Sequence, residues 1–185
     1  MLHKNQVHPM KHIFLLLVLF VTAICTSAQQ TNIRIGVSLD VLAPVGSFSD
    51  FAGVGFGGSA RGVMGVGKAG DITLTTGYYN LGWKDLDPEE KGYSYIIPVL
   101  IGYRHHFSKI FVEPFAGYGN YGEHYSNNFV NENASVSTFA WGAGVGYSNE
   151  GIEAGLRYLG LTHEGTFSTI GIYVGYNFPL HSTKR

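Results

Sequence analysis

Six charged side chains recur on strand faces that are otherwise rich in glycine, a setting in which buried charges need partners. They are Arg34, Arg61, Arg104, Glu113, Glu153 and Arg157. The two-residue turn Ser108-Lys109 would place Arg104 directly opposite Glu113 on adjacent antiparallel strands. The sequence therefore predicts an ion pair between Arg104 and Glu113. This pair could form a gate or a proton path, but compensation of charge in a filled interior is the simpler role, because a buried unpaired charge is costly.

Histidines are the next candidates for chemistry. His105 and His106 are adjacent on a predicted strand, where neighbours point to opposite faces and cannot readily share one metal ion. His124 and His163 fall in predicted loops and complete no convincing ligand spacing. The sequence therefore predicts no metal site.

One loop could hold a hydrolase site, because it contains His163, Glu164 and Ser168. Polar residues are ordinary in such a loop, however, and the chain has no G-x-S-x-G elbow. Its GxG patterns, such as Gly144-Val145-Gly146, do not open a helix after a strand, so they are not phosphate loops. We expect no catalytic residue and no cofactor, and keep an enzyme as an alternative.

The composition indicates one folded domain. The chain has 185 residues, of which 26 are glycine, 14% are aromatic and 14% are charged. Few charges with many aromatic residues argue against disorder, and no basic stripe is present for nucleic acid. No stretch after residue 28 approaches about 18 consecutive apolar residues, so a membrane location would require strands instead of a helix.

Residues 1–28 resemble a secretory signal peptide. Lys4 and Lys11 precede an apolar run, Ile13–Ile24, which is too short to cross a bilayer as a helix. Small residues in Thr26-Ser27-Ala28 then suit cleavage. Two start positions stay open, Met1 and Met10, because the segment from Met10 is itself a conventional signal start.

Cys25 is the only cysteine. It is either discarded with the leader or lipidated, and the large Ile24 before it disfavours lipidation. Cleavage after Ala28 would leave no thiol for disulfides or catalysis.

Period-2 alternation predicts eight strands. They are Asn32–Asp40, Gly57–Val66, Asp71–Leu81, Tyr93–His106, Ile110–Gly119, Ser137–Tyr147, Ile152–Leu159 and Thr169–Phe178. The even-numbered links are tight turns, whereas the odd-numbered links, 41–56, 82–92, 120–136 and 160–168, are longer. This rhythm is typical of an eight-stranded antiparallel transmembrane up-and-down β-barrel, with short turns in the periplasm and long loops outside. The barrel would cover residues 29–178, and residues 179–185 would form a short tail.

We expect the apolar face of each strand to point outward. In the strand 137–147, Trp141 and Val145 alternate with Gly142, Gly144 and Gly146. Glycine is a poor choice for a wetted strand surface but suits a narrow lumen. Aromatic residues also fall near both ends of the apolar faces, as two membrane interfaces would require. The opposite orientation would describe a soluble lipocalin-like carrier.

Eight strands leave an interior that side chains can fill. Five apolar residues are expected to point inward: Ile96, Pro98, Leu100, Phe111 and Phe115. The sequence therefore predicts a plugged lumen without substantial conductance.

Four segments carry a resemblance to a known group: Ile97–Arg104, Phe115–Gly119, Trp141–Tyr147 and Val174–Phe178. On these the chain resembles small bacterial outer-membrane β-barrel proteins, often labelled porin family or outer-membrane protein β-barrel domain. The resemblance implies a Gram-negative outer membrane, insertion by the barrel-assembly machinery, and no cofactor. It implies no single activity. Members commonly end on an aromatic residue, whereas here Pro179–Arg185 follow Phe178.

The sequence thus predicts a monomeric, non-enzymatic outer-membrane protein with a structural or surface-interaction role. Its expected partners are outer-membrane lipid and lipopolysaccharide, the assembly machinery, and an extracellular ligand for the loops. The alternatives are a lipid-modifying enzyme, such as a lipid A deacylase or acyltransferase, and a soluble lipocalin-like carrier.

Overall fold

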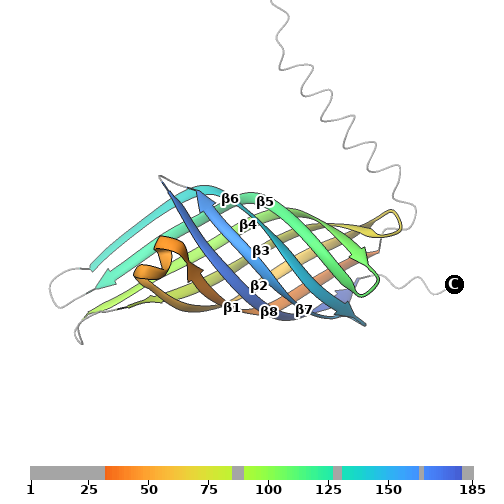
Figure 1. Cartoon of the computed structure of the whole chain (residues 1–185), viewed down its shortest axis with the longest axis horizontal. Helices are drawn as coiled ribbons and strands as arrows, with labels where there is room; N and C mark the ends of the chain where they lie inside the picture. Colours follow the sequence, from red (N-terminus) through yellow and green to blue (C-terminus); the bar gives the residue numbers. More distant parts are fainter. Residues whose placement is uncertain (1–31, 85–89, 127–130, 163–164, 181–185) are drawn as a thin grey trace, which may run out of the picture. The chain divides into compact units, whose positions relative to one another are not determined.

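The computed structural model describes residues 32–84, 90–126, 131–162 and 165–180. They form eight strands and one short 3-10 helix, drawn in Figure 1. The strands are β1 (Ile33–Val45), β2 (Ala52–Val66), β3 (Gly70–Trp83), β4 (Lys91–Phe107), β5 (Ile110–Ser126), β6 (Asn131–Asn149), β7 (Ile152–Thr162) and β8 (Thr166–Pro179), and the helix η1 is Gly46–Asp50. The predicted leader, its cleavage site and Cys25 lie outside the described residues.

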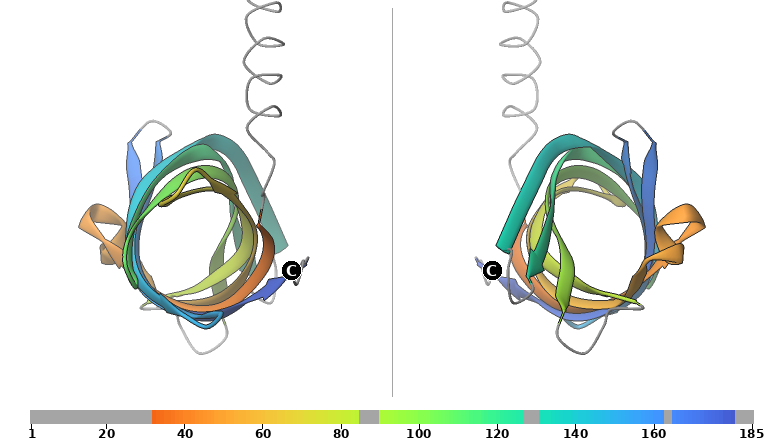
Figure 2. Two further views of the ribbon diagram at one scale, coloured as in Figure 1. Left: turned by 90° about the vertical axis from the view of Figure 1, so that its right-hand side faces the viewer. Right: turned by 90° about the vertical axis from the view of Figure 1, so that its left-hand side faces the viewer.

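The strands form a closed barrel in which each pairs antiparallel with the next and β8 pairs with β1. Figure 2 looks along the barrel from both ends and shows the complete ring of strands. The predicted fold class, an eight-stranded antiparallel up-and-down barrel, is confirmed. Within the described residues, no helix is both long and apolar enough to cross a membrane.

Tight turns join β2 to β3, β4 to β5 and β6 to β7 at one end of the barrel, here called the turn end. Gly67 and Gly151 adopt positive φ angles of 67° and 90° in these turns, a conformation that glycine takes without steric cost. The turn at Ser108 fixes the register between β4 and β5, so that Gly102 pairs with Phe115 and His105 with Val112.

At the opposite end, called the loop end, the strands run farther than the sequence predicts. β5 continues to Ser126 and β6 begins at Asn131, although 120–136 was expected to be a loop. The expected loop 41–56 is mostly strand as well, with η1 between β1 and β2, and β7 and β8 extend into the expected loop 160–168. At the ends of β5 and β6, residues 123–126 and 131–135 are mostly polar on both faces, so the backbone pairing persists there without the apolar alternation that reveals a strand in sequence.

The apolar faces point outward, as predicted. Leu39 is 78% exposed and Ile172 is 59% exposed, whereas the intervening positions carry glycines or buried side chains, both polar and apolar. Exposed aromatic side chains lie toward both ends of this outer surface: Tyr78, Tyr118 and Trp141 toward the loop end, and Tyr103, Tyr147, Tyr176 and Phe178 toward the turn end. The outer surface therefore has the apolar band and aromatic girdles of a membrane-spanning barrel.

An apolar layer fills the interior at the loop end. It includes Leu42, Leu81, Ile96, Leu100, Phe115, Leu159 and Leu161. Phe48 of η1 is fully buried in this layer and packs edge-on against Phe167 of β8 and Tyr121 of β5, with ring centroids 5.5 and 6.0 Å apart. The predicted inward orientation of all five residues, Ile96, Pro98, Leu100, Phe111 and Phe115, is confirmed.

We predict that Ile172→Arg, placed in the middle of the outer apolar band, lowers the free energy of unfolding in phospholipid vesicles by about 2–4 kcal/mol, because a cation would then face hydrocarbon. Ser135→Arg, on the exposed end of β6, is the matched control and should leave stability unchanged. Urea titrations in vesicles measure both. Equal effects of the two variants would contradict a hydrocarbon-facing band.

Candidate functional site

The strongest candidate site is the charged network in the interior, between the turn end and the apolar layer. Arg104 of β4 donates from Nε and Nη2 to Oε2 of Glu113 on β5, at 3.2 and 2.7 Å. The predicted ion pair is therefore confirmed. Arg104 is 1% exposed and Glu113 is 5% exposed, so the pair is isolated from solvent.

Glu153 of β7 joins this pair to the other side of the barrel. Its Oε2 accepts from Arg104 Nη1 at 2.5 Å, and its Oε1 accepts from Arg61 Nη1 of β2 at 2.5 Å. Asn177 of β8 donates to Oε2 from 2.9 Å. One carboxylate thus ties together β2, β4, β7 and β8 across the interior.

Polar partners complete the coordination of the network. Thr73 of β3 donates to Glu113 Oε1 at 2.6 Å, and Thr75 of the same strand accepts from Arg61 Nε at 3.1 Å. The Arg104 guanidinium also lies over the ring of Phe111, 3.7 Å from its centroid. Hydrogen bonds and a ring face together offset the cost of removing these charges from water.

A second group lies between this network and the apolar layer. Arg157 of β7 donates from Nη1 to the hydroxyl of Tyr79 at 3.1 Å and lies 3.7 Å from Asp40 Oδ1. Asp40 of β1 accepts from Ser38 Oγ at 2.9 Å. The Arg157 guanidinium also faces the ring of Tyr173, 4.8 Å from its centroid. This group adds a second cross-interior connection, between β1, β3 and β7.

A third group lies at the turn end. Asp71 of β3 accepts from Arg34 Nη2 of β1 at 2.7 Å, and its Oδ2 lies 2.7 Å from His106 Nε2 of β4. Arg34 and His106 are about one-fifth exposed, so this group is open to solvent at the barrel mouth. All six charged residues singled out in the sequence therefore face the interior.

The histidines do not converge. His106 points inward to Asp71, whereas His105 contacts the rings of Tyr103 and Phe107, which belong to the outer face. His124 lies against Tyr93, with its Nδ1 2.6 Å from Asn133 Oδ1. Among the described residues, no three His, Cys, Asp or Glu side chains are arranged to hold a metal ion.

The candidate hydrolase residues are only partly described. Ser168 is buried, and its Oγ lies 2.8 Å from the hydroxyl of Tyr158. His163 and Glu164 lie outside the described residues, so the structure does not test their arrangement with Ser168.

Sequence reasoning missed several members of the interior network. Asp40 and Asp71 occupy inward positions of predicted strands, so the same alternation that identified Glu113 could have found them. Tyr79 and Tyr173 alternate with outward residues in the same way. Nothing in the sequence shows which of these residues meet across the barrel.

Comparisons with known proteins identify the fold. No protein-family model matches the chain, and no curated protein matches it either. Among solved structures, the attachment invasion locus protein Ail of Yersinia pestis, in complex with the heparin analogue sucrose octasulfate, has a TM-score of 0.58 at 15% identity, covering 80% of this chain and 97% of Ail. The N-terminal β-barrel domain of Pseudomonas aeruginosa OprF has a TM-score of 0.59 at 16% identity, covering 80% and 100% of the two chains.

Neisserial surface protein A is similar to the same extent, with a TM-score of 0.55 at 12% identity over 82% of this chain and 100% of that protein. At these identities the likeness concerns the fold alone. The fold is that of small bacterial outer-membrane β-barrels, which agrees with the resemblance inferred from sequence.

We predict that Arg104→Met lowers the free energy of unfolding by about 3–5 kcal/mol, because it leaves Glu113 and Glu153 short of a buried partner. Adding Glu113→Gln to this variant should recover part of the loss, since the carboxylate that Arg104 chiefly neutralises is then uncharged. Arg34→Met, at the solvated mouth of the barrel, is the control and should lower the free energy of unfolding by less than Arg104→Met does. Thermal unfolding in detergent measures all three, and an unchanged transition in Arg104→Met would contradict the stabilising role.

Proposed function

We propose that the chain is an integral outer-membrane β-barrel protein without catalytic activity, which has a structural or surface-interaction role and a closed interior. The observation that carries this proposal is the inversion of polarity: the outer surface is apolar and girdled by aromatic residues, whereas ion pairs fill the inside. Only a hydrocarbon surrounding makes the exposed band of Ile, Val and Leu favourable.

The same inversion argues against a soluble lipocalin-like carrier. Such a carrier needs an apolar cavity for its ligand and a wetted outer surface. Here the inner face carries buried ion pairs, and the large exposed side chains of the outer face are apolar. We therefore set this alternative aside.

Two separate layers support a closed interior. The ionic network joins opposite walls through Glu153, and the apolar layer with Phe48 lies above it at the loop end. Eight strands leave little room beyond what such side chains occupy. Because the apolar layer contains no charge that could switch, we assign the Arg104–Glu113 pair to charge compensation and not to gating.

The loop end is the natural place for contacts with other molecules. β5 and β6 continue their pairing to Ser126 and Asn131, and β4 pairs with β5 as far as Lys91, whereas β7 ends at Thr162. The ends of β4, β5 and β6 therefore form a three-stranded arm that extends past β7. Residues 132–135 of this arm are exposed. The solved structures with the same fold include a protein named for attachment and invasion and another named as a surface protein, which favours a surface-interaction role here.

Location and assembly form part of the same proposal. The leader, residues 1–28, would direct export and be cleaved, and the barrel-assembly machinery would insert the chain into the outer membrane. The exposed Phe178 on β8 would then be its internal aromatic signal. Lipopolysaccharide and phospholipid would surround a monomeric barrel.

We predict that the purified protein forms no stable large channels in planar bilayers. The double variant Arg104→Met/Glu113→Gln should also stay closed, because the apolar layer does not depend on these charges. Current recordings at both polarities measure this, with a general porin as the positive control. Steady conductance steps from the wild-type protein would contradict a closed interior. Steps from the double variant alone would show that the Arg104–Glu113 pair acts as a gate.

We predict that surface expression in a non-adherent bacterium increases its binding to a panel of host-cell and extracellular-matrix surfaces, and that shortening the arm abolishes the gain. The shortened variant lacks residues 123–134 and joins Gly122 to Ser135, which are paired across β5 and β6, through an added Asn-Gly turn. Heat-modifiable migration on unboiled gels checks that both proteins fold.

Lipid A mass spectra of the same strains separate the enzymatic alternative from this role. Unchanged lipid A with arm-dependent binding is the expected result. A mass shift on expression would identify a lipid-modifying enzyme, and the absence of binding by the folded wild-type protein would leave a structural role alone.

A further inference from the structure

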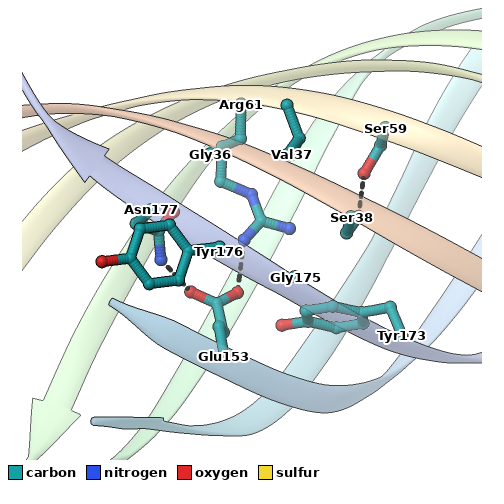
Figure 3. Close-up of a pocket in the computed structure, with 10 residues that line it drawn as sticks. All are labelled: Gly36, Val37, Ser38, Ser59, Arg61, Glu153, Tyr173, Gly175, Tyr176 and Asn177. Carbon is teal, nitrogen blue, oxygen red and sulfur yellow. Dashed lines mark hydrogen bonds and ion pairs between the residues drawn. The ribbon is translucent and has the colours of Figure 1, made fainter. Parts of the chain in front are cut away.

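A small hollow lies in the interior beside the ionic network. Its polar wall consists of Ser38, Ser59, Arg61, Glu153, Tyr173 and Asn177, which come from β1, β2, β7 and β8. The hollow measures about 10 Å³, which is the room that roughly one water molecule requires. Figure 3 shows these residues around the hollow, with the Arg61–Glu153 ion pair on one side.

Arg61 leaves one donor group unused at this hollow. Its Nε donates to Thr75 and its Nη1 donates to Glu153, but its Nη2 is buried without any hydrogen-bond partner. The side chain is 6% exposed, so bulk water does not compensate this nitrogen. In Figure 3 the second terminal nitrogen of Arg61 points away from Glu153, into the space that the labelled residues enclose. An unpaired buried donor on a charged group is costly, so an acceptor is expected there.

The barrel seam keeps the hollow open. Gly36 of β1 and Gly175 of β8 lie beside it, on the two strands that close the ring. A Cβ atom on Gly175 would clash with the carbonyl oxygen of Val37, and one on Gly36 would meet the side-chain oxygen of Asn177. Without a Cβ atom, positions 36 and 175 themselves add no side chain to the hollow, which leaves the space beside Arg61 open.

The charge around the hollow selects a neutral occupant. A cation, Arg61, and an anion, Glu153, both line it. A bound anion would meet the Glu153 carboxylate, and a bound metal cation would meet the Arg61 guanidinium. A small neutral molecule that both accepts and donates hydrogen bonds is compatible with Arg61 and with Glu153.

We propose that one ordered water molecule occupies this hollow and is part of the folded barrel. It accepts a hydrogen bond from Arg61 Nη2 and donates its two hydrogens to the hydroxyl oxygens of Ser38 and Ser59 in the same wall. These groups meet the requirement that a buried water has two to four polar partners. The water therefore completes the coordination of Arg61 that the protein leaves open.

A crystal structure of the refolded or membrane-extracted protein, at a resolution that orders internal water, tests the proposal. We expect a density peak within about 2.7–3.2 Å of Arg61 Nη2 in the hollow. An empty hollow, or an Arg61 side chain turned toward a protein acceptor, would overturn it. A second crystal grown with sodium bromide separates a water from an anion, because anomalous signal in the hollow would identify a halide site instead.

Two variants test the role of Arg61. Arg61→Met should lose the peak, because the donor is removed, whereas Arg34→Met should retain it, because Arg34 does not line the hollow. If Arg61→Met does not fold, the double variant Arg61→Met/Glu153→Gln replaces it, since it removes the donor without leaving Glu153 as a carboxylate that has lost a cation. A peak that persists unchanged in the Arg61 variant would show that other groups hold the water, and would refute the assignment.

Discussion

The hydrogen bonding between β1 and β8 is the interaction on which the rest of the structure depends. It runs from Arg34 opposite Pro179 to Val45 opposite Ser168, and it turns an open sheet into a ring. In hydrocarbon an unpaired backbone group costs several kcal/mol, so a sheet with two free edges could not lie there. Closure removes both edges at once. The need for closure explains the presence of Gly36 and Gly175 at the seam between β1 and β8. Because these residues lack side chains, the two strands and the Asn177 side chain can pack closely.

Closure with only eight strands also determines what the interior can be. Inward side chains from opposite walls come within hydrogen-bond distance, so charges that are far apart in the sequence meet: Arg61 and Glu153 are 92 residues apart and share a direct hydrogen bond. A buried charge placed at any inward position must therefore find a partner on another strand. The ionic network meets this constraint. We therefore attribute its composition to the need to neutralise buried charges and not to a chemical reaction.

This constraint separates what the sequence could predict from what it could not. Alternation identified the two faces of every strand, because one face is apolar throughout, and the short turn at Ser108-Lys109 fixed the register that brings Arg104 to Glu113. The contact of Glu153 with both arginines depends on the curvature of the whole ring, which no local pattern encodes. The ends of β5 and β6 were missed for the opposite reason, since residues 123–126 and 131–135 are mostly polar and show no apolar alternation. Phe48 was also missed, because an aromatic residue in a loop does not reveal that η1 turns it into the barrel.

The division of the interior into an ionic layer and an apolar layer explains where function can reside. The ionic layer orients the strands through directional bonds, whereas the apolar layer with Phe48 fills the loop end with aliphatic and aromatic side chains. Neither layer offers a reacting group open to a substrate. The arm of β4, β5 and β6 is different, because backbone pairing holds it together and residues 132–135 at its end are exposed. Exposed side chains there can change with small cost to the barrel, whereas closure and charge compensation constrain the residues of the interior and the seam.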